Sequence, residues 1–220
     1  MGGAMEQWII QECQGVNFGD ARLKHRLEKI VSHFTESPMQ SIPSNNNSWK
    51  DTIGTYRFMS NENVTYDKIL EGHAQATMSR LSETDVALAV QDTTSTDFTG
   101  SRASDNLGYL ESKHCRGIFV HPTILVTPDK VNLGILHAEM WSRDNSTLGK
   151  KHERKHKDIE EKESYCWLNS YKAADKAACE YPEKLIVSVG DRESDIYELL
   201  SLAAQETSKA KLLLRAAQNR

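Results

Sequence analysis

The sequence lacks the features that assign many chains to a specialised class. Its four cysteines form no Cys-x-x-Cys pair, which disfavours both a zinc knuckle and a disulfide framework. No apolar run approaches the length of a membrane span, and residues 1–11 lack the basic start and small-residue cleavage site of a signal peptide. We therefore expect a cytoplasmic protein with reduced thiols and no membrane partner.

The chain also has no excess of positive charge. Its net charge is −4, so any surface that binds nucleic acid must be local. The composition is otherwise that of a soluble globular protein, with 38% hydrophobic and 26% charged residues. A length of 220 residues has room for one domain of ordinary size and a smaller one.

Residues 1–83 are predicted to form a small helical domain. Between Ala21 and Phe34 the apolar residues recur at helical spacing, and Asp20 is placed as the N-cap of this helix. The opposite face carries four cations, namely Arg22, Lys24, Arg26 and Lys29. The first long helix is therefore expected to be amphipathic, with one basic face.

Two further helices are predicted in the same domain. A linker with two prolines follows the first helix, and Asn45–Ser48 then offers caps for a helix that contains Trp49 to Phe58. Residues 66–81 form the third predicted helix, after a turn-like Asn61-Glu-Asn63. Helices of this kind would pack as a small bundle.

From Val86 onward the pattern changes to strands. Strands are predicted at residues 86–91, 117–126, 131–141, 185–189 and 211–215. A turn at 128–130 joins the second and third strands, and helices at about 160–180 and 195–204 separate the later ones. Three strands in a meander, followed by alternating helices and strands, suit a mixed five-strand sheet over residues 84–220. The predicted fold class is α+β.

Two aspartates stand where apolar strands run into polar turns. Asp92 closes the first predicted strand and Asp191 closes the fourth. Carboxyl ends of buried strands are common places for ligands and metals, and the first and fourth strands of such a sheet can lie side by side. The pair could then hold a divalent cation that supports cleavage or transfer of a phosphodiester. Sites of this kind normally contain a third acidic ligand.

Short stretches of sequence along nearly the whole chain form an ordered set. They are Phe18–Leu23, Thr55–Phe58, Gln91–Thr94, Gly117, His121, Leu133–Leu136, Trp141–Arg143, Lys162–Ser164 and Asp191–Ile196. In this order they resemble the bacterial DDE transposases of the IS-four family, the group of the transposon Tn-five enzyme. Asp-Thr-Thr or Asp-Arg-Glu alone would be a weak signal, so the shared order carries the resemblance.

The resemblance implies a cut-and-paste transposase. Its helical domain would grip double-stranded DNA at the inverted-repeat ends of a transposon, and an RNase H-like catalytic core would follow. Asp92 and Asp191 would be catalytic residues that bind two Mg²⁺ or Mn²⁺ ions. Members of this family work as homodimers on DNA, in association with the bacterial nucleoid.

The resemblance also implies roles for other side chains. DNA contacts would come from Arg22, Arg26, Arg57, Arg143 and Lys162. Neighbours of the active site would be Thr93, His121 and Arg192. For the helical arginines the alternative is a solvated helix face, and for His121 it is a histidine satisfied within the core.

The chain departs from the family pattern at its carboxyl end. The family's third metal ligand is a glutamate on a later helix, which is expected to lie beyond residue 220. The RNase H-like domain is therefore predicted to be incomplete and inactive by itself. Two alternatives stay open: a DNA-binding regulatory fragment, and an RNase H-like nuclease that completes its site with Glu193 or Glu198.

The segment Lys150–Lys157 is strongly basic, with five Lys or Arg residues and one Glu. Such a run is usually a solvated loop. A role in following the phosphates of DNA is the alternative, and strong salt dependence would reveal it.

Overall fold

The structure is a computed structural model that describes residues 2–149, 157–217 and 219. It divides into two compact units, one ending at Ser79 and the other beginning at Arg80. The division falls in the last turn of helix α5 (Tyr66–Leu81), a few residues before the predicted boundary between residues 83 and 84.

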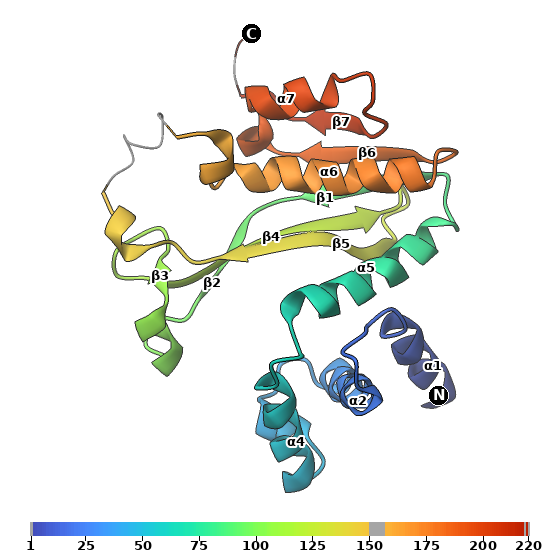
Figure 1. The fold of residues 1–220 in the computed structure, drawn as a ribbon, viewed down its shortest axis with the longest axis vertical. Helices are drawn as coiled ribbons and strands as arrows, with labels where there is room; N and C mark the ends of the chain where they lie inside the picture. Colours follow the sequence, from blue (N-terminus) through green and yellow to red (C-terminus); the bar gives the residue numbers. More distant parts are fainter. Residues whose placement is uncertain (1, 150–156, 218, 220) are drawn as a thin grey trace. The chain divides into compact units, whose positions relative to one another are not determined.

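The first unit is helical, as predicted. Its helices are α1 (Gly2–Glu12), α2 (Ala21–Glu36), α3 (Ile42–Asn45), α4 (Trp49–Met59) and α5. Figure 1 labels all of them except the short α3. The predicted caps are confirmed: the Asp20 side chain accepts from a backbone amide at the start of α2, and that of Ser48 does so at the start of α4. Helix α3 is an addition within the two-proline linker. Pro43 lies in its first turn, where a helix does not need the missing N–H.

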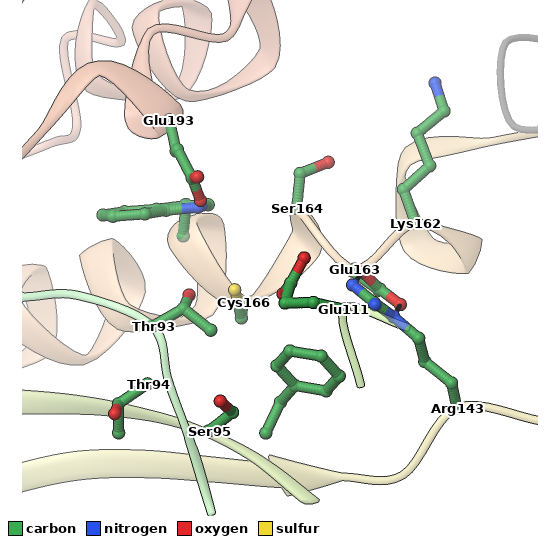
Figure 2. A pocket seen from close by; sticks show the side chains of 12 residues that line it. Thr93, Thr94, Ser95, Glu111, Arg143, Lys162, Glu163, Ser164, Cys166 and Glu193 are labelled. Carbon is green, nitrogen blue, oxygen red and sulfur yellow. Dashed lines mark hydrogen bonds and ion pairs between the residues drawn. The ribbon is translucent and has the colours of Figure 1, made fainter. Parts of the chain in front are cut away.

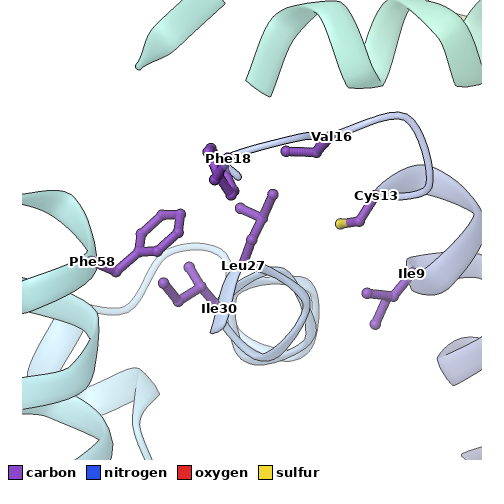
Figure 3. Packing of buried hydrophobic residues seen from close by; sticks show 7 residues of the cluster. All are labelled: Ile9, Cys13, Val16, Phe18, Leu27, Ile30 and Phe58. Carbon is purple, nitrogen blue, oxygen red and sulfur yellow. The ribbon is translucent and has the colours of Figure 1, made fainter. Parts of the chain in front are cut away.

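The core of this unit forms where α1, α2 and α4 present apolar residues. Figure 3 shows its buried members, Ile9, Cys13, Val16, Phe18, Leu27, Ile30 and Phe58. The rings of Phe18 and Phe58 meet edge to face with their centroids 5.7 Å apart. Burial raises the pKa of the Cys13 thiol to about 11, so this cysteine packs as a neutral apolar group.

The second unit contains the sheet. The described residues form seven strands: β1 (Val86–Gln91), β2 (Thr94–Asp97), β3 (Gly108–Tyr109), β4 (Arg116–Val126), β5 (Asn132–Trp141), β6 (Leu185–Gly190) and β7 (Lys211–Leu214). The five strands predicted from the sequence are all present, in the order β5, β4, β1, β6, β7. The first three alternate in direction, whereas β6 and β7 run parallel to β1. The α+β class is thereby confirmed.

Strand β2 continues the ladder of β1 after a break of two residues. Both strands pair with β4 in the same antiparallel register. Leu88 of β1 pairs with Val126, and Thr94 of β2, six residues later, pairs with Val120, six residues earlier on β4. The residues in the break are Asp92 and Thr93. The ladder on β4 therefore fixes the chain immediately before and after Asp92.

Among the described residues, two α-helices accompany the sheet. Helix α6 (Tyr165–Glu180) packs against β6, β5, β1 and β4, and α7 (Tyr197–Ala203) packs beside α6. Each begins later than the sequence predicts because a short 3₁₀ turn precedes it, at Ile159–Glu161 and at Arg192–Ser194. The face of α6 toward the sheet is rich in small and aromatic residues, including Trp167, Tyr171, Ala174 and Ala178.

Candidate functional site

The sheet brings the two predicted aspartates to the same edge. Strands β1 and β6 are parallel neighbours, paired without a shift from Val86 with Leu185 to Val90 with Val189. Asp92 and Asp191 each stand two residues beyond that last pair. Adjacent strands lie about 4.8 Å apart, so equal steps past a common register place the two residues side by side. The predicted pairing of these strands is confirmed.

Each aspartate is oriented by a backbone amide. The Thr93 N–H donates to Asp92 Oδ1 at 2.8 Å, and the Glu193 N–H donates to Asp191 Oδ1 at the same distance. Asp191 thereby caps the 3₁₀ turn that follows β6. Both side chains are exposed to solvent. The result is a pair of carboxylates with defined orientation and open access.

The donor set suits a hard cation. Mg²⁺ prefers carboxylate oxygens, and it commonly takes one or two carboxylates from the protein while water and substrate phosphates complete its shell. Within the described residues no three His, Cys, Asp or Glu side chains form a group that could hold a metal. Glu193 and Glu198 therefore do not complete a three-ligand site with the aspartates in this structure.

A buried hydrogen-bonded chain runs beneath Asp92. His121 on β4 is fully buried, with Nδ1 2.8 Å from Thr93 Oγ1 and Nε2 3.2 Å from Gln91 Oε1. The Gln91 amide nitrogen donates to Ser188 Oγ on β6 at 2.9 Å. Burial lowers the pKa of His121 to about 4, so the ring is neutral near pH 7. The predicted neighbours Thr93 and His121 are thus in direct contact.

A pocket of about 510 Å³ opens beside this chain, on the side of α6 (Figure 2). Its lining residues are Thr93, Thr94, Ser95, Glu111, Phe119, Arg143, Lys162, Glu163, Ser164, Cys166, Trp167 and Glu193. Hydroxyl groups and charged side chains dominate this wall. Neither aspartate lines the pocket, but Thr93 and Glu193, whose amides orient the aspartates, both do.

Arg143 is held firmly at the wall of this pocket. Its Nε and Nη2 donate to the two carboxylate oxygens of Glu163 at 2.6 and 2.8 Å, and its Nη1 donates to the Leu110 carbonyl at 2.9 Å. The guanidinium also lies 4.1 Å from the centre of the Phe119 ring. Glu163 raises the pKa of Arg143. Lys162, in contrast, extends away from this ion pair in Figure 2.

The three arginines predicted to contact DNA in the first unit differ in solvent exposure and in their ion pairs. The Arg22 side chain is 91% exposed and pairs with Asp20, its own helix cap, at 2.8 Å. Arg26 is only a quarter exposed and pairs with Asp51 of α4 at 3.0 Å. Arg57 is exposed in the last turn of α4. Arg26 therefore ties α2 to α4, whereas Arg22 and Arg57 face solvent.

Helix α4 also carries an exposed pair of aromatic residues that the sequence pattern did not separate from its buried residues. Trp49 is 73% exposed and Tyr56 48% exposed, along the border of the buried face that carries Thr52, Thr55 and Phe58. Their spacing of seven residues is two helical turns, so the face could have been found by separating α4 into its two sides. Exposed aromatic rings beside cations are typical of an interaction surface.

Other predicted features fall elsewhere. Arg192 is exposed in the turn directly after Asp191. Residues 150–156 of the basic segment lie outside the described residues, so its two alternatives stay predictions. In the described parts of the chain, every helix is too short or too polar to cross a bilayer.

Comparison with known families adds one finding. A family model described as transposase DNA-binding matches residues 5–64. The helical unit carries a transposase DNA-binding domain. The matched segment includes α2, α3 and α4 together with Arg22, Arg26 and Arg57. DNA is therefore a partner of this chain, as predicted.

Proposed function

We propose that the protein is a DDE-type, cut-and-paste transposase, whose helical unit binds the inverted-repeat ends of a transposon. The observation that carries the proposal is the match of residues 5–64 to transposase DNA-binding domains. Strand cleavage and transfer belong to the sheet unit, where Asp92 and Asp191 share one edge. Their exposure leaves that edge accessible to a DNA backbone.

The topology of the sheet supports an RNase H-like core. Three antiparallel strands are followed by two strands parallel to the first, and β1 is central between β4 and β6. This arrangement places the carboxyl ends of β1 and β6 at one edge, the place where metal-binding carboxylates are proposed. It agrees with the family that the ordered sequence motifs resemble.

Asp92 and Asp191 would hold Mg²⁺ or Mn²⁺ in this proposal. Such ions, when bound, activate a water or a DNA 3′-hydroxyl and stabilise the leaving oxygen. The chain's own residues orient the ligands: the amides of Thr93 and Glu193 each hold one carboxylate oxygen. Metal charge would also offset the repulsion between the neighbouring carboxylates.

In the first unit, DNA contact is assigned to the exposed side chains. Arg22 and Arg57 would bind phosphates through charge-assisted hydrogen bonds, and the Trp49 and Tyr56 pair would lie against the duplex. Arg26 would act mainly by fixing α4 relative to α2. Two protomers would bring two transposon ends together.

DNA binding tests this proposal directly. Fluorescence anisotropy should show tighter binding to duplexes taken from the DNA that flanks the gene than to scrambled duplexes, with strong salt dependence. Arg22→Ala and Arg57→Ala should each weaken binding and reduce the salt slope by about one. Lys176→Ala, which removes a cation that is 79% exposed on α6, is the matched control and should change neither. Equal affinity for flanking and scrambled duplexes would contradict end recognition.

A second candidate is a DNA-binding chain that occupies ends without cutting them. It is favoured by the lack of a three-ligand group among the described residues. Incubation of the purified chain with labelled flanking DNA and Mn²⁺ tests this candidate. Nicking that disappears in Asp92→Asn would reject it, whereas intact DNA under tight binding agrees with both candidates, because the sheet domain is predicted to be inactive by itself.

A further inference from the structure

The chain neighbours of Asp92 are both bound to one buried imidazole. Gln91 and Thr93 alternate with Asp92, so their side chains point to the α6 face of the sheet while Asp92 points away. His121 stands opposite this break on β4 and contacts Gln91 on one ring nitrogen and Thr93 on the other. A single residue on another strand thus holds the main chain on both sides of the aspartate.

The hydrogen bonds fix where each proton lies. The amide nitrogen of Gln91 donates to Ser188, so its carbonyl oxygen faces His121 and accepts from Nε2–H. The remaining nitrogen, Nδ1, then carries no proton and accepts from the Thr93 hydroxyl. The imidazole is thus neutral, with its proton on Nε2. Each hydrogen bond is then donated in the same direction, from Thr93 to His121, from His121 to Gln91 and from Gln91 to Ser188.

We propose that His121 is a positioning residue that, by holding both chain neighbours of Asp92, keeps the Asp92 carboxylate ready to bind a metal ion. The inference rests on the proposed metal site. The last step of the linkage is the Thr93 amide, which donates to Asp92 Oδ1 at 2.8 Å. If the Thr93 hydroxyl loses its partner, the residue can rotate in the gap between β1 and β2, and the amide moves with it.

In the described part of the sheet, strand pairing does not hold this point directly, although the Thr93 side chain also interacts with the Cys166 thiol of α6. Asp92 and Thr93 lie outside the regular pairing with β4, and the pairing of β1 with β6 extends only to Val90 and Val189. The side chains of His121, Gln91 and Ser188 are almost wholly buried, with exposed fractions of 0 to 2%. The bonds from His121 to Gln91 and from Gln91 to Ser188 are therefore shielded from water, which makes them costly to break, whereas the bond to Thr93 lies at the edge of the pocket.

Mn²⁺ binding by the whole chain, without DNA, tests this role. The titration follows free Mn²⁺ by electron paramagnetic resonance and compares the wild type with Thr93→Val, which keeps the shape of the side chain and removes its hydroxyl. Loss of such an outer hydrogen bond typically weakens metal affinity roughly 10-fold or more, and we expect a loss of that order. Thr93→Ser restores the hydroxyl and should restore affinity. His121→Phe, which removes both ring hydrogen bonds, should weaken binding at least as much if it folds.

A matched control separates positioning from general stability. Thr123 lies on the same face of β4 as His121, is fully buried, and has a hydroxyl without a hydrogen-bond partner among the described residues. Thr123 pairs with Gln91 in the ladder, but its hydroxyl gives no hydrogen bond to the linkage, so Thr123→Val changes the core as conservatively as Thr93→Val and Mn²⁺ affinity should stay unchanged. Circular dichroism verifies that all variants are folded at the temperature of the titration.

The possible results separate the metal site itself from the positioning role of His121. If the wild type binds Mn²⁺ no better than Asp92→Asn, the metal site is wrong and the inference falls with it. If the wild type binds and Thr93→Val binds equally well, the metal site stands and the positioning role is wrong. Nitrogen-15 spectra of the imidazole give an independent result: a protonated Nε2 and a bare Nδ1 support the linkage, and a protonated Nδ1 overturns it.

Discussion

Replacement of His121 by glutamine should remove a large part of the pH dependence of stability. Burial lowers the pKa of His121 from an ordinary value of 6.5 to about 4, while the nearby Glu139 and Asp92 oppose this shift and His137 adds to it. Between these two pH values the unfolded chain binds a proton that the folded chain excludes. Stability is therefore fully present above pH 6.5 and falls as the pH drops toward 4.

The size of the effect follows from the difference in pKa. Each pKa unit corresponds to about 1.4 kcal/mol, so a shift of this size amounts to roughly 3 kcal/mol of unfolding free energy between pH 7 and pH 4. Glutamine can keep the bond to Gln91 through its own amide but cannot take up a proton. The variant should be less stable at pH 7 by roughly 1–3 kcal/mol, since the Thr93 hydroxyl loses its acceptor.

Urea unfolding at a series of pH values, in buffer without divalent metal, measures both effects. Carboxylates and the other histidines contribute equally to both proteins, so the difference between the two curves isolates His121. The gap in unfolding free energy should shrink, or reverse, as the pH falls from 7 to 4. Curves that stay parallel over this range would refute a buried, neutral His121.

Three further predictions concern other parts of the chain. Gly108→Ala would place a methyl group on top of the Arg143 carbonyl, so thermal unfolding should show a loss of roughly 1–3 kcal/mol. Asp175→Ala removes the acceptor for two amides before β7, including that of the buried Ala210, and should lower the denaturation midpoint, whereas Asp175→Asn should retain most of the stability. Arg57→Ala should weaken DNA binding without changing the melting temperature, because its side chain is exposed.

Much of the fold could be predicted because the apolar pattern and the punctuating residues agree. The strands that end just before Asp92 and Asp191 are mainly apolar, as expected for neighbouring parallel strands in the interior of a sheet. The caps Asp20 and Ser48 were visible as short polar residues before helical spacing began. These local signals located the elements and, through the strand order, the aspartate pair.

The missed features depend on contacts between distant residues. Strand β2 is exposed along its whole length and polar in sequence, so no alternation marks it; only its register on β4 makes it a strand. The motif predicts a DNA contact for Arg143, but does not reveal its ion pair with Glu163, which lies 20 residues away in sequence. Its DNA contact stays a prediction.

His121 shows the same limit at the candidate site. The sequence placed it in an apolar strand and left open whether it was a core residue or an active-site neighbour. Its partners Thr93 and Gln91 lie 28 and 30 residues away, and only the antiparallel register brings them to the ring. In the structure both alternatives hold, since His121 is a buried core residue and is also hydrogen-bonded to the two chain neighbours of Asp92.

Asp92 and Asp191 are proposed to form one metal site. Fe²⁺ can occupy sites built for Mg²⁺, and with peroxide and ascorbate it generates radicals that cut the nearby polypeptide chain. Mass spectrometry of the fragments should show paired cuts close to Asp92 and close to Asp191, and both should disappear in Asp92→Asn. Cuts at only one of these strand ends, or cuts that persist in the variant, would contradict a shared site.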